Sequence, residues 1–458
     1  MWINREYELA ALEERWNNNK AEFIVIYGRR RIGKSELIEK FIKGKRGVRL
    51  LAREESETLQ LQRFSKKLAL LFRDALLEKN PLASWDAFFE LIAEKAKERL
   101  VIALDEFPYL CKENPALPSI IQDYWDNRLK ETKIFLILSG SSVSMMEKKV
   151  LRHKSPLYGR RSAQFLLRPF TFRDVFLYLG MPIEEAIETY SVFGGTPAYV
   201  IEFEKKKDLF WNIKSKIFRD DSFLYRDIEF LLREGLKEPR YYFSVLSSVA
   251  KGNTKISDII NDTGLKKSIV GKYLSILSEL YLVRREVPIT ENPLRSRKGI
   301  YILYDNYFKF WFRYVYPNKE EIERRMAGYL IENTVKPSFS RFVSFTFEDV
   351  CREALSSTTF AMAKIGRWWD RGSEIDIVGL NENEKSILFA ECEWSKNVDA
   401  RQVLADLRKK AEMVDWNIGK RTEYYAVFAK SFKKKFKEKD VFLFDLNDLE
   451  RIFRKKKE

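Results

Sequence analysis

The chain has 458 residues, of which 45% are hydrophobic and 33% are charged, and its formal net charge at pH 7 is +16. This length predicts roughly two to four domains, and the charge favours polyanionic partners, nucleic acid ahead of an anionic membrane face. The three widely spaced cysteines exclude a disulfide framework, and no apolar run is long enough to span a membrane. We therefore expect a cytoplasmic protein without membrane association, and the excess of Lys, Arg and Glu favours a thermophile.

Strand-like and helix-like stretches alternate over the first 171 residues. The apolar runs "AEFIVIYG" (21–28), "LVIALDE" (100–106) and "KIFLILSG" (133–140) are typical of strands buried on both faces of a parallel sheet. "SELIEKFIK" (35–43) has helical spacing. The alternation predicts a doubly wound α/β sheet.

The loop 28–35, "GRRRIGKS", matches the phosphate-loop pattern G-x-x-x-x-G-K-[ST] between a predicted strand and a predicted helix. Backbone N–H groups of such a loop point at phosphates. Lys34 would reach the β- and γ-phosphates of ATP, and Ser35 would ligate Mg²⁺. A chance glycine-rich turn is the alternative. The residues assigned to nucleotide binding are Gly28, Arg29, Arg30, Arg31, Ile32, Gly33, Lys34, Ser35 and Glu36.

Three consecutive arginines occupy the variable positions of this loop. Those positions contribute mainly backbone groups to the phosphates, so we expect most of the three side chains to point outward. Arg29, Arg30 and Arg31 are then not expected to contact ATP together, and they add local positive potential.

Two acids follow the next buried strand, in "VIALDEF". Asp105 and Glu106 stand at a strand end, where ligands of α/β sheets bind. We expect Asp105 to hold Mg²⁺ through water and Glu106 to polarise the attacking water.

Further polar residues follow the third strand. In "LILSGSS", Ser139 or Ser141 would hydrogen-bond the attacking water or the γ-phosphate, unless the serines only satisfy their own turn. In "SPLYGRRS", Arg160 and its neighbour Arg161 are candidates to neutralise transition-state charge. A surface salt bridge is the alternative for at least one of them.

Residues 172–340 read as mostly helical. Between 240 and 290, a short helix, a glycine turn, a longer helix and a strand-like tail follow a winged-helix order. The residues expected at the start and on the exposed face of the second helix are Lys266, Lys267, Ser268 and Lys272, where a recognition helix meets DNA. A protein-interaction role is the alternative. Residues 296–340 are rich in aromatics and read as a packed connector.

Residues 341–450 read as helix, three strands, helix and strand. Glu348 falls on the first helix, Asp376 on the second strand and Glu391 on the third. The three carboxylates could converge, and residues 391 and 393 share one strand face.

The motifs "INREYEL", "GRRRIGKS", "LDEFPYL", "LILSGSSVSMM", "SPLYGRR" and "FGGTPAYV" together resemble the archaeal ATPase family, P-loop ATPases close to the AAA+ and STAND groups. The resemblance implies a RecA-type αβα core (1–171), a helical lid (172–236) and a winged helix (237–295). It places "INRE" near the adenine and the "GGTP" turn in the lid, as a sensor of nucleotide. After the connector (296–340), it implies a restriction-endonuclease-like domain of the PD-(D/E)xK type (341–458).

Such a nuclease site needs carboxylates around Mg²⁺ and a lysine that activates water. Glu348, Asp376 and Glu391 would form a second Mg²⁺ site, but Glu393 stands where the motif has lysine, and Lys396 lies three residues further on. Two alternatives follow: metal-dependent cleavage, or a fold retained for binding in which these acids pair with the arginines of "GRWWDRGSE".

The combined expectation is a Mg²⁺-dependent ATPase that self-associates and acts on DNA, with no small-molecule substrate beyond ATP. The alternative is a STAND-like switch, in which slow ATP turnover changes an oligomer and the C-terminal domains only bind DNA or protein.

Overall fold

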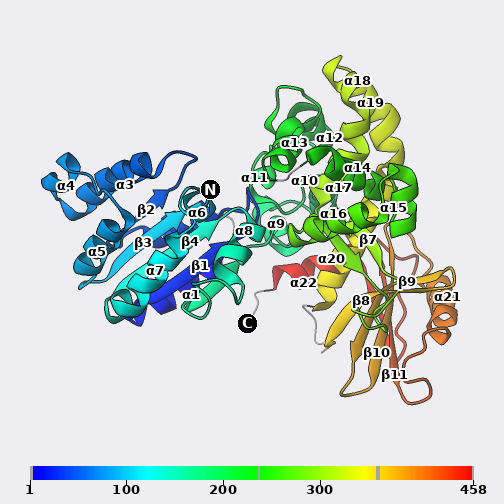
Figure 1. The fold of residues 1–458 in the computed structure, drawn as a ribbon. Coiled ribbons are helices and arrows are strands. Elements are labelled where there is room, and N and C mark those ends of the chain that lie inside the picture. The colour runs from blue at the N-terminus through cyan, green and yellow to red at the C-terminus, as the bar shows by residue number, and fades with distance from the viewer. Residues whose placement is uncertain (1–3, 236–237, 357–361, 456–458) are drawn as a thin grey trace. The chain divides into compact units, whose positions relative to one another are not determined.

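The computed structural model describes residues 4–235, 238–356 and 362–455 (Figure 1). The chain divides into two compact units, residues 1–169 and residues 170–458. In the described ranges, no helix has both the length and the apolar character that crossing a bilayer requires.

A five-stranded parallel sheet forms the centre of the first unit, in the order β2-β3-β4-β1-β5. The predicted parallel α/β sheet is confirmed. In register, Tyr27 pairs with Gly140, and Leu51 pairs with Asp105, so the carboxyl ends of these strands meet at one edge. The strands are β1 (Glu22–Tyr27), β2 (Gly47–Leu51), β3 (Leu100–Asp105), β4 (Ile134–Gly140) and β5 (Ala163–Leu166).

Helices cover both faces of this sheet because alternate strand residues feed two cores. Phe23 and Val25 of β1 enter one core, and Ile24 and Ile26 enter the other. Helices α1 and α2 close the second core, whereas α3 to α8 close the first (Figure 1). The helices are α1 (Glu6–Asn17), α2 (Lys34–Ile42), α3 (Glu57–Phe72), α4 (Ala75–Lys79), α5 (Trp85–Lys95), α6 (Phe107–Glu113), α7 (Leu117–Asn127) and α8 (Val143–Met146).

The sequence patterns did not indicate β2 and β5, which are the two edges of the sheet. Most of their residues are only half-buried. An edge strand lacks the continuous apolar run that marks a strand with neighbours on both sides.

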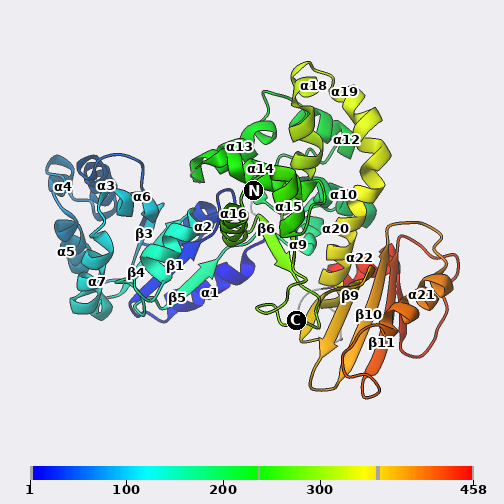
Figure 2. The same cartoon turned by 45° about the vertical axis from the view of Figure 1, so that its right-hand side comes forward.

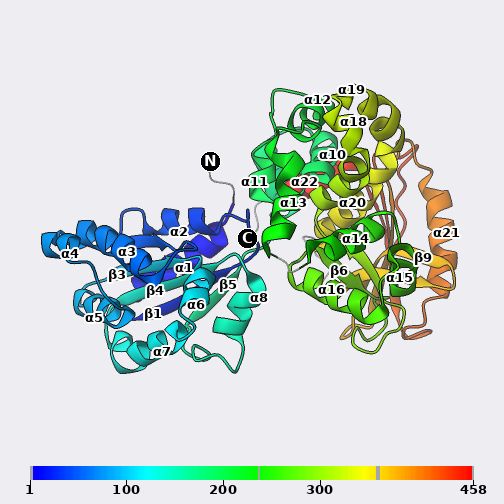
Figure 3. The same cartoon turned by 45° about the horizontal axis from the view of Figure 1, so that its top comes forward.

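The second unit begins with a helical region that contains one short antiparallel strand pair, β6 (Val283–Glu286) and β7 (Ile300–Leu303) (Figures 1 and 2). Gly264 ends α15 in the left-handed conformation, with φ of 66°. The longer α16 and then β6 follow, in the predicted order (Figure 3). The helices are α9 (Phe172–Leu179), α10 (Ile183–Phe193), α11 (Pro197–Val200), α12 (Leu209–Asn212), α13 (Phe223–Gly235), α14 (Pro239–Ala250), α15 (Ile256–Thr263), α16 (Lys267–Glu279), α17 (Asn306–Phe310), α18 (Lys319–Glu323), α19 (Ala327–Leu330) and α20 (Lys336–Ser356).

The aromatic-rich stretch after β7 forms the core of this helical region. Trp311 and Tyr307 are fully buried. The Trp311 Nε1 donates to the Tyr225 carbonyl at 2.9 Å, and the Tyr307 hydroxyl donates to the Leu224 carbonyl at 2.5 Å. Each large side chain therefore buries its apolar surface with its polar atom hydrogen-bonded.

A second five-stranded sheet, in the order β12-β11-β10-β9-β8, follows α20. Strands β8 to β10 are antiparallel neighbours, and β10 to β12 are parallel. Helix α20 packs on β8 to β10, and α21 packs against β9 to β11 from the other face (Figures 1 and 2). The elements are β8 (Lys364–Asp370), β9 (Ser373–Asn381), β10 (Ser386–Glu393), α21 (Ala400–Glu412), β11 (Thr422–Ala429), β12 (Val441–Phe444) and α22 (Leu446–Arg454).

The predicted order of helix, three strands, helix and strand is confirmed for this region, and β12 and α22 were missed. The first predicted strand, "TFAMAKIGRWW", lies partly outside the described residues, and β8 begins at Lys364. Helix α22 was missed because its charged residues continue into the lysine-rich tail. A reciprocal capping box between Asp445 and Asp448 lies at the N-terminus of this helix.

A cluster of half-buried charged side chains joins β6 to α20. The Asp349 carboxylate lies 2.8 Å from Arg284, 3.6 Å from Lys309 and 3.4 Å from Arg352. Burial would raise the pKa of Asp349, but these cations outweigh it and hold the pKa well below its usual range. Asp349 therefore stabilises the fold wherever it is ionised, and this stability is lost as the pH falls through its lowered pKa.

We predict that Asp349→Asn lowers the free energy of unfolding by about 1.5–3 kcal/mol, because it leaves three half-buried cations without their carboxylate. Urea unfolding of the full chain measures the loss. The matched control is Glu332→Gln, which removes an exposed pair with Lys336 at 2.6 Å and should change stability by less than about 1 kcal/mol. Equal losses of unfolding free energy in the two variants would contradict a stabilising role of the charge cluster.

Candidate active site

The phosphate loop joins β1 to α2, and two of its positions require glycine. Gly28 has φ of 154°, and a Cβ there would lie 2.5 Å from the Leu167 carbonyl oxygen. Gly33 has φ of 87° and directly precedes α2. Only glycine adopts such backbone conformations without strain, so the two glycines fix the turn of the loop.

Lys34 folds back over this loop. Its side chain is buried, and Nζ donates to the carbonyl oxygens of Gly28 and Arg29 at 3.0 Å each. Burial lowers the pKa of Lys34 to about 8, although Glu106 and Asp105 act in the opposite direction. The ammonium group is thus held within the loop that would surround a phosphate chain.

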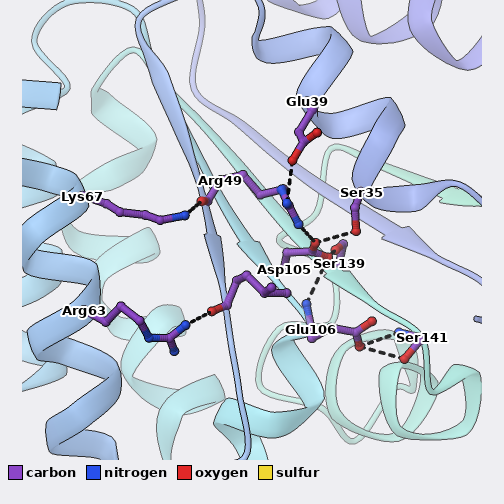
Figure 4. A network of polar contacts seen from close by, with 10 residues as sticks. Ser35, Glu39, Arg49, Arg63, Lys67, Asp105, Glu106, Ser139 and Ser141 are labelled. Carbon is purple, nitrogen blue, oxygen red and sulfur yellow. Dashed lines mark hydrogen bonds and ion pairs between the residues drawn. The ribbon is translucent and has the colours of Figure 1, made fainter. Parts of the chain in front are cut away.

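Asp105 is the centre of a polar network at the carboxyl edge of the sheet (Figure 4). Its Oδ2 accepts hydrogen bonds from the Ser35 hydroxyl at 2.7 Å and from Arg49 at 2.6 Å, and its Oδ1 accepts one from the Ser139 hydroxyl. Burial would raise the pKa of Asp105, but the hydrogen bonds from Ser139, Ser35 and Arg49 hold it below its usual value. The carboxylate is therefore ionised although it is fully buried.

Glu106 is held separately, at the start of α6. Its backbone is left-handed, with φ of 57°. Its Oε2 accepts hydrogen bonds from the Ser141 backbone N–H at 3.0 Å and from the Ser141 hydroxyl at 2.8 Å. A left-handed non-glycine residue costs about 1–3 kcal/mol, and such strain concentrates at functional sites.

The structure gives the partners of two serines and one arginine. Ser139 hydrogen-bonds Asp105 and Ser141 hydrogen-bonds Glu106, so the predicted contact with the attacking water or the γ-phosphate stays a prediction. Arg160 forms an ion pair with Asp126 at 2.8 Å, which is the surface salt bridge considered as its alternative.

The three loop arginines differ from one another. Arg31 is exposed, as expected for a side chain that points outward. Arg30 donates to the Tyr109 hydroxyl at 2.6 Å. Arg29 is only 5% exposed. The expectation that most of the three side chains point outward therefore does not extend to Arg29. Of the other predicted residues, Ile32 is part of the core shared with α2, and Glu36 faces solvent on the first turn of α2.

One residue of the site was missed in the sequence, and a second was indicated only through its motif. Arg49 of β2 bridges Asp105 and Glu39, the latter at 2.5 Å. It lies on an edge strand that no pattern indicated. Arg5 donates to the carbonyl oxygens of Ile32, at 3.2 Å, and Arg168, at 2.6 Å. The only signal for Arg5 was the motif "INREYEL", and its contact places that segment beside the phosphate loop.

The C-terminal acids lie near one another, but each has its own partner. Glu391 pairs with Lys410 of α21 at 2.7 Å, and Glu348 pairs with Arg367 at 3.2 Å. The Asp376 carboxylate accepts a hydrogen bond from the Cys392 N–H at 2.9 Å. Over the residues that the structure describes, no three Asp, Glu, His or Cys side chains are grouped to hold a metal ion.

Burial raises the pKa of Glu348 and of Glu391, and the neighbouring Asp376 adds to both shifts. Lys410 was missed because it lies on a helix outside the strand motif. Lys396 lies instead 3.7 Å from Glu184 of α10. The Glu348–Arg367 pair is the arginine network considered as the alternative to a metal site.

Comparison with known proteins adds the following similarities. Residues 2–203 match the family described as ATPase domains predominantly from Archaea. Residues 184–303 and 311–403 match two families of unknown function. An uncharacterized ATP-binding protein of Methanocaldococcus jannaschii, MJ0423, is 54% identical over 46 residues, which are 10% of this chain and 78% of that protein.

Two similarities extend over most of the chain. The uncharacterized protein MJECL04 of Methanocaldococcus jannaschii is 38% identical over 98% of this chain and 100% of its own length. The Walker-type ATPase PABY2304 of Pyrococcus abyssi has a similar fold, with a TM-score of 0.51 and 19% identity over 68% of this chain and 96% of that one. The chain therefore belongs to the same family as MJECL04, and its first unit is a P-loop ATPase domain of the archaeal type.

Proposed function

We propose that the chain hydrolyses ATP in a Mg²⁺-dependent reaction at the edge where β1, β3 and β4 end. The observation that carries this proposal is the 2.7 Å hydrogen bond between Ser35, which follows the loop lysine, and the buried Asp105 at the end of β3, two strands away from β1. A hydroxyl and an ionised carboxylate beside a phosphate loop are the oxygen ligands that Mg²⁺ takes in such enzymes. The residues present therefore fit the ion.

Each side chain of the site has a distinct role in this proposal. Lys34 and the loop N–H groups bind the β- and γ-phosphates, and Mg²⁺, when bound, neutralises phosphate charge. Glu106 orients and polarises the attacking water. Ser141 positions Glu106 through its two hydrogen bonds, and Ser139 positions Asp105.

We predict that Lys34→Ala lowers ATP turnover at least a hundredfold, because it removes the buried ammonium group from the loop. Glu106→Gln should keep ATP binding and lose turnover, because it retains shape but not charge. The matched control is Lys43→Ala, an exposed lysine just after α2, which should have no effect. Release of radiolabelled phosphate and equilibrium ATP binding separate the two losses. Unchanged turnover in Lys34→Ala would contradict the proposal.

We also propose that the ATPase acts on DNA through a winged helix formed by α15, α16 and the β6–β7 pair. The exposed side chains that support it are Lys266, Lys267, Ser268 and Lys272, at the start and on the outer face of α16. Arg295 and Arg297, between β6 and β7, are exposed as well. Such residues suit phosphate contacts along a groove.

A second candidate is an ATP-driven, self-associating switch. The observation that favours it is the 2.6 Å contact between Arg49 and Asp105. The Arg49 guanidinium already contacts the Asp105 oxygen that would ligate Mg²⁺. Slow turnover follows if this contact must break in each cycle. Turnover stimulated by DNA supports the first candidate, whereas an ATP-dependent change of mass in light scattering with slow turnover supports the second.

The second unit would comprise a helical lid (172–236), the winged helix (237–295), the aromatic connector (296–340) and a restriction-endonuclease-like domain (341–458). We propose that this last domain is retained for binding. Its three acids do not form a metal-ligand set, because Arg367, Lys410 and the Cys392 N–H already pair with them. On this proposal the three acids do not cleave DNA.

We predict that the full chain does not cut labelled duplex, single-stranded or branched DNA in Mg²⁺ or Mn²⁺ above the background of Asp376→Ala. The same variant should keep the parent's ATP turnover, because Asp376 lies outside the ATP site. Denaturing gels and phosphate release measure the two activities. Cleavage that Asp376→Ala abolishes would show that the domain is a nuclease.

A further inference from the structure

A cavity of about 600 Å³ lies within the second unit. Its lining residues come from helix α14 and the turn after it, strands β6 and β7, the segment 309–313, helix α20 and strands β8 and β9. This volume lies in the range of small-ligand sites. The cavity is separate from the ATP site, which is built entirely from the first unit.

The inner part of the cavity carries more positive than negative charge. Arg284, Lys309 and Arg352 surround Asp349, and Glu286 is the second carboxylate, 2.8 Å from Arg284 and 3.6 Å from Arg352. With the Glu348–Arg367 pair, which also lines the cavity, four cations share three carboxylates. Burial lowers the pKa of Lys309, although Asp349 acts in the opposite direction. An anion bound in the cavity would reduce this excess of positive charge.

The outer part carries two further arginines, Arg313 and Arg341. Neither side chain forms an ion pair with any residue in the described ranges. Arg341 is exposed, and Arg313 is half-buried with its guanidinium 5.5 Å from the Tyr314 ring. Their charge is therefore available to a ligand.

An aromatic side chain stands beside these arginines. Phe345 lies one turn after Arg341 on α20, lines the cavity and is 45% exposed. Its neighbour Phe342 is only 5% exposed and packs on Phe310 and Tyr314. Both rings line the cavity, but Phe342 belongs to the core, whereas Phe345 keeps part of its surface open to a ligand.

We propose that this cavity binds a nucleoside phosphate, with the phosphate on Arg341 and Arg313 and the base on Phe345. Arginine matches phosphate oxygens with a planar pair of donors, and an aromatic ring stacks on any base. An acidic side chain of a protein would use the arginines but not the ring. This inference deepens the proposed action on DNA, because it gives the second unit a place for one nucleotide of a single strand.

The test measures binding of a short fluorescein-labelled oligothymidylate to the full chain by anisotropy, over a range of salt concentrations. Arg341→Glu should weaken binding at least tenfold and reduce the slope of log K against log salt by about 0.7 for each phosphate that the protein no longer neutralises. Phe345→Ala should weaken binding at least fivefold with the slope unchanged, because it removes stacking and no charge.

The matched control is Arg401→Glu, which makes the same charge change on an exposed residue outside the cavity. Arg401 lies in the first turn of α21, where a glutamate suits the helix dipole, so this variant should fold and bind within twofold of the parent. Parent-like ATP turnover and melting temperature verify that all three variants are folded. Parent-like binding by Arg341→Glu and Phe345→Ala, or an equal loss in Arg401→Glu, would overturn the proposal.

Competition distinguishes the sources of the ligand. Displacement by thymidine monophosphate assigns the cavity to a free nucleotide, and preference for a 5′-phosphorylated oligonucleotide without such displacement assigns it to a strand end. Displacement by polyglutamate as efficient as by oligothymidylate would instead show an acidic-protein site and contradict the proposal. None of these probes carries a triphosphate, so a negative result leaves the proposed ATP turnover intact.

Discussion

The first unit depends on one buried carboxylate. Asp105 is fully buried, and an unpaired charge at that depth would cost several kcal/mol. Its two oxygens instead accept hydrogen bonds from Ser35, Ser139, Arg49 and the Glu106 N–H, which come from four different elements or their ends. These contacts offset the cost of burying the charge. They also hold the phosphate loop, the edge strand β2 and the central strands close together.

Strand order explains why these contacts are possible. Because β4 lies between β1 and β3, Ser139 reaches Asp105 from the adjacent strand, and Ser141 just beyond it reaches Glu106. Strand β2 flanks β3 on the other side and supplies Arg49. Parallel strands end at a common edge, so residues up to 70 positions apart in the sequence converge without any long loop.

The sequence identified what depends on local pattern and missed what depends on pairing between distant segments. The glycines and Lys34 of the loop, Asp105 at a strand end and the order of elements in residues 341–450 follow from spacing and periodicity, which short windows contain. Arg49 and Lys410 were missed because each reaches its carboxylate from a neighbouring strand or helix. The contacts of Ser139 and Ser141 with the two acids were not predicted for the same reason, because short windows of sequence do not contain the sheet register that places these residues together.

The second unit differs from the first in how the charges of its carboxylates are balanced. The single negative charge of Asp105 is balanced by several hydrogen-bond donors. Around Asp349 and Glu286, by contrast, three cations share two carboxylates. Part of the net charge of +16 thus lies in a half-buried cluster, where water screens it less than on the open surface. Helix α20 connects this charge to the rest of the unit, because it carries Arg341 at the cavity mouth and Glu348 toward the second sheet. A ligand bound at Arg341 would therefore contact the helix against which the second sheet packs, and its binding energy would stabilise that packing.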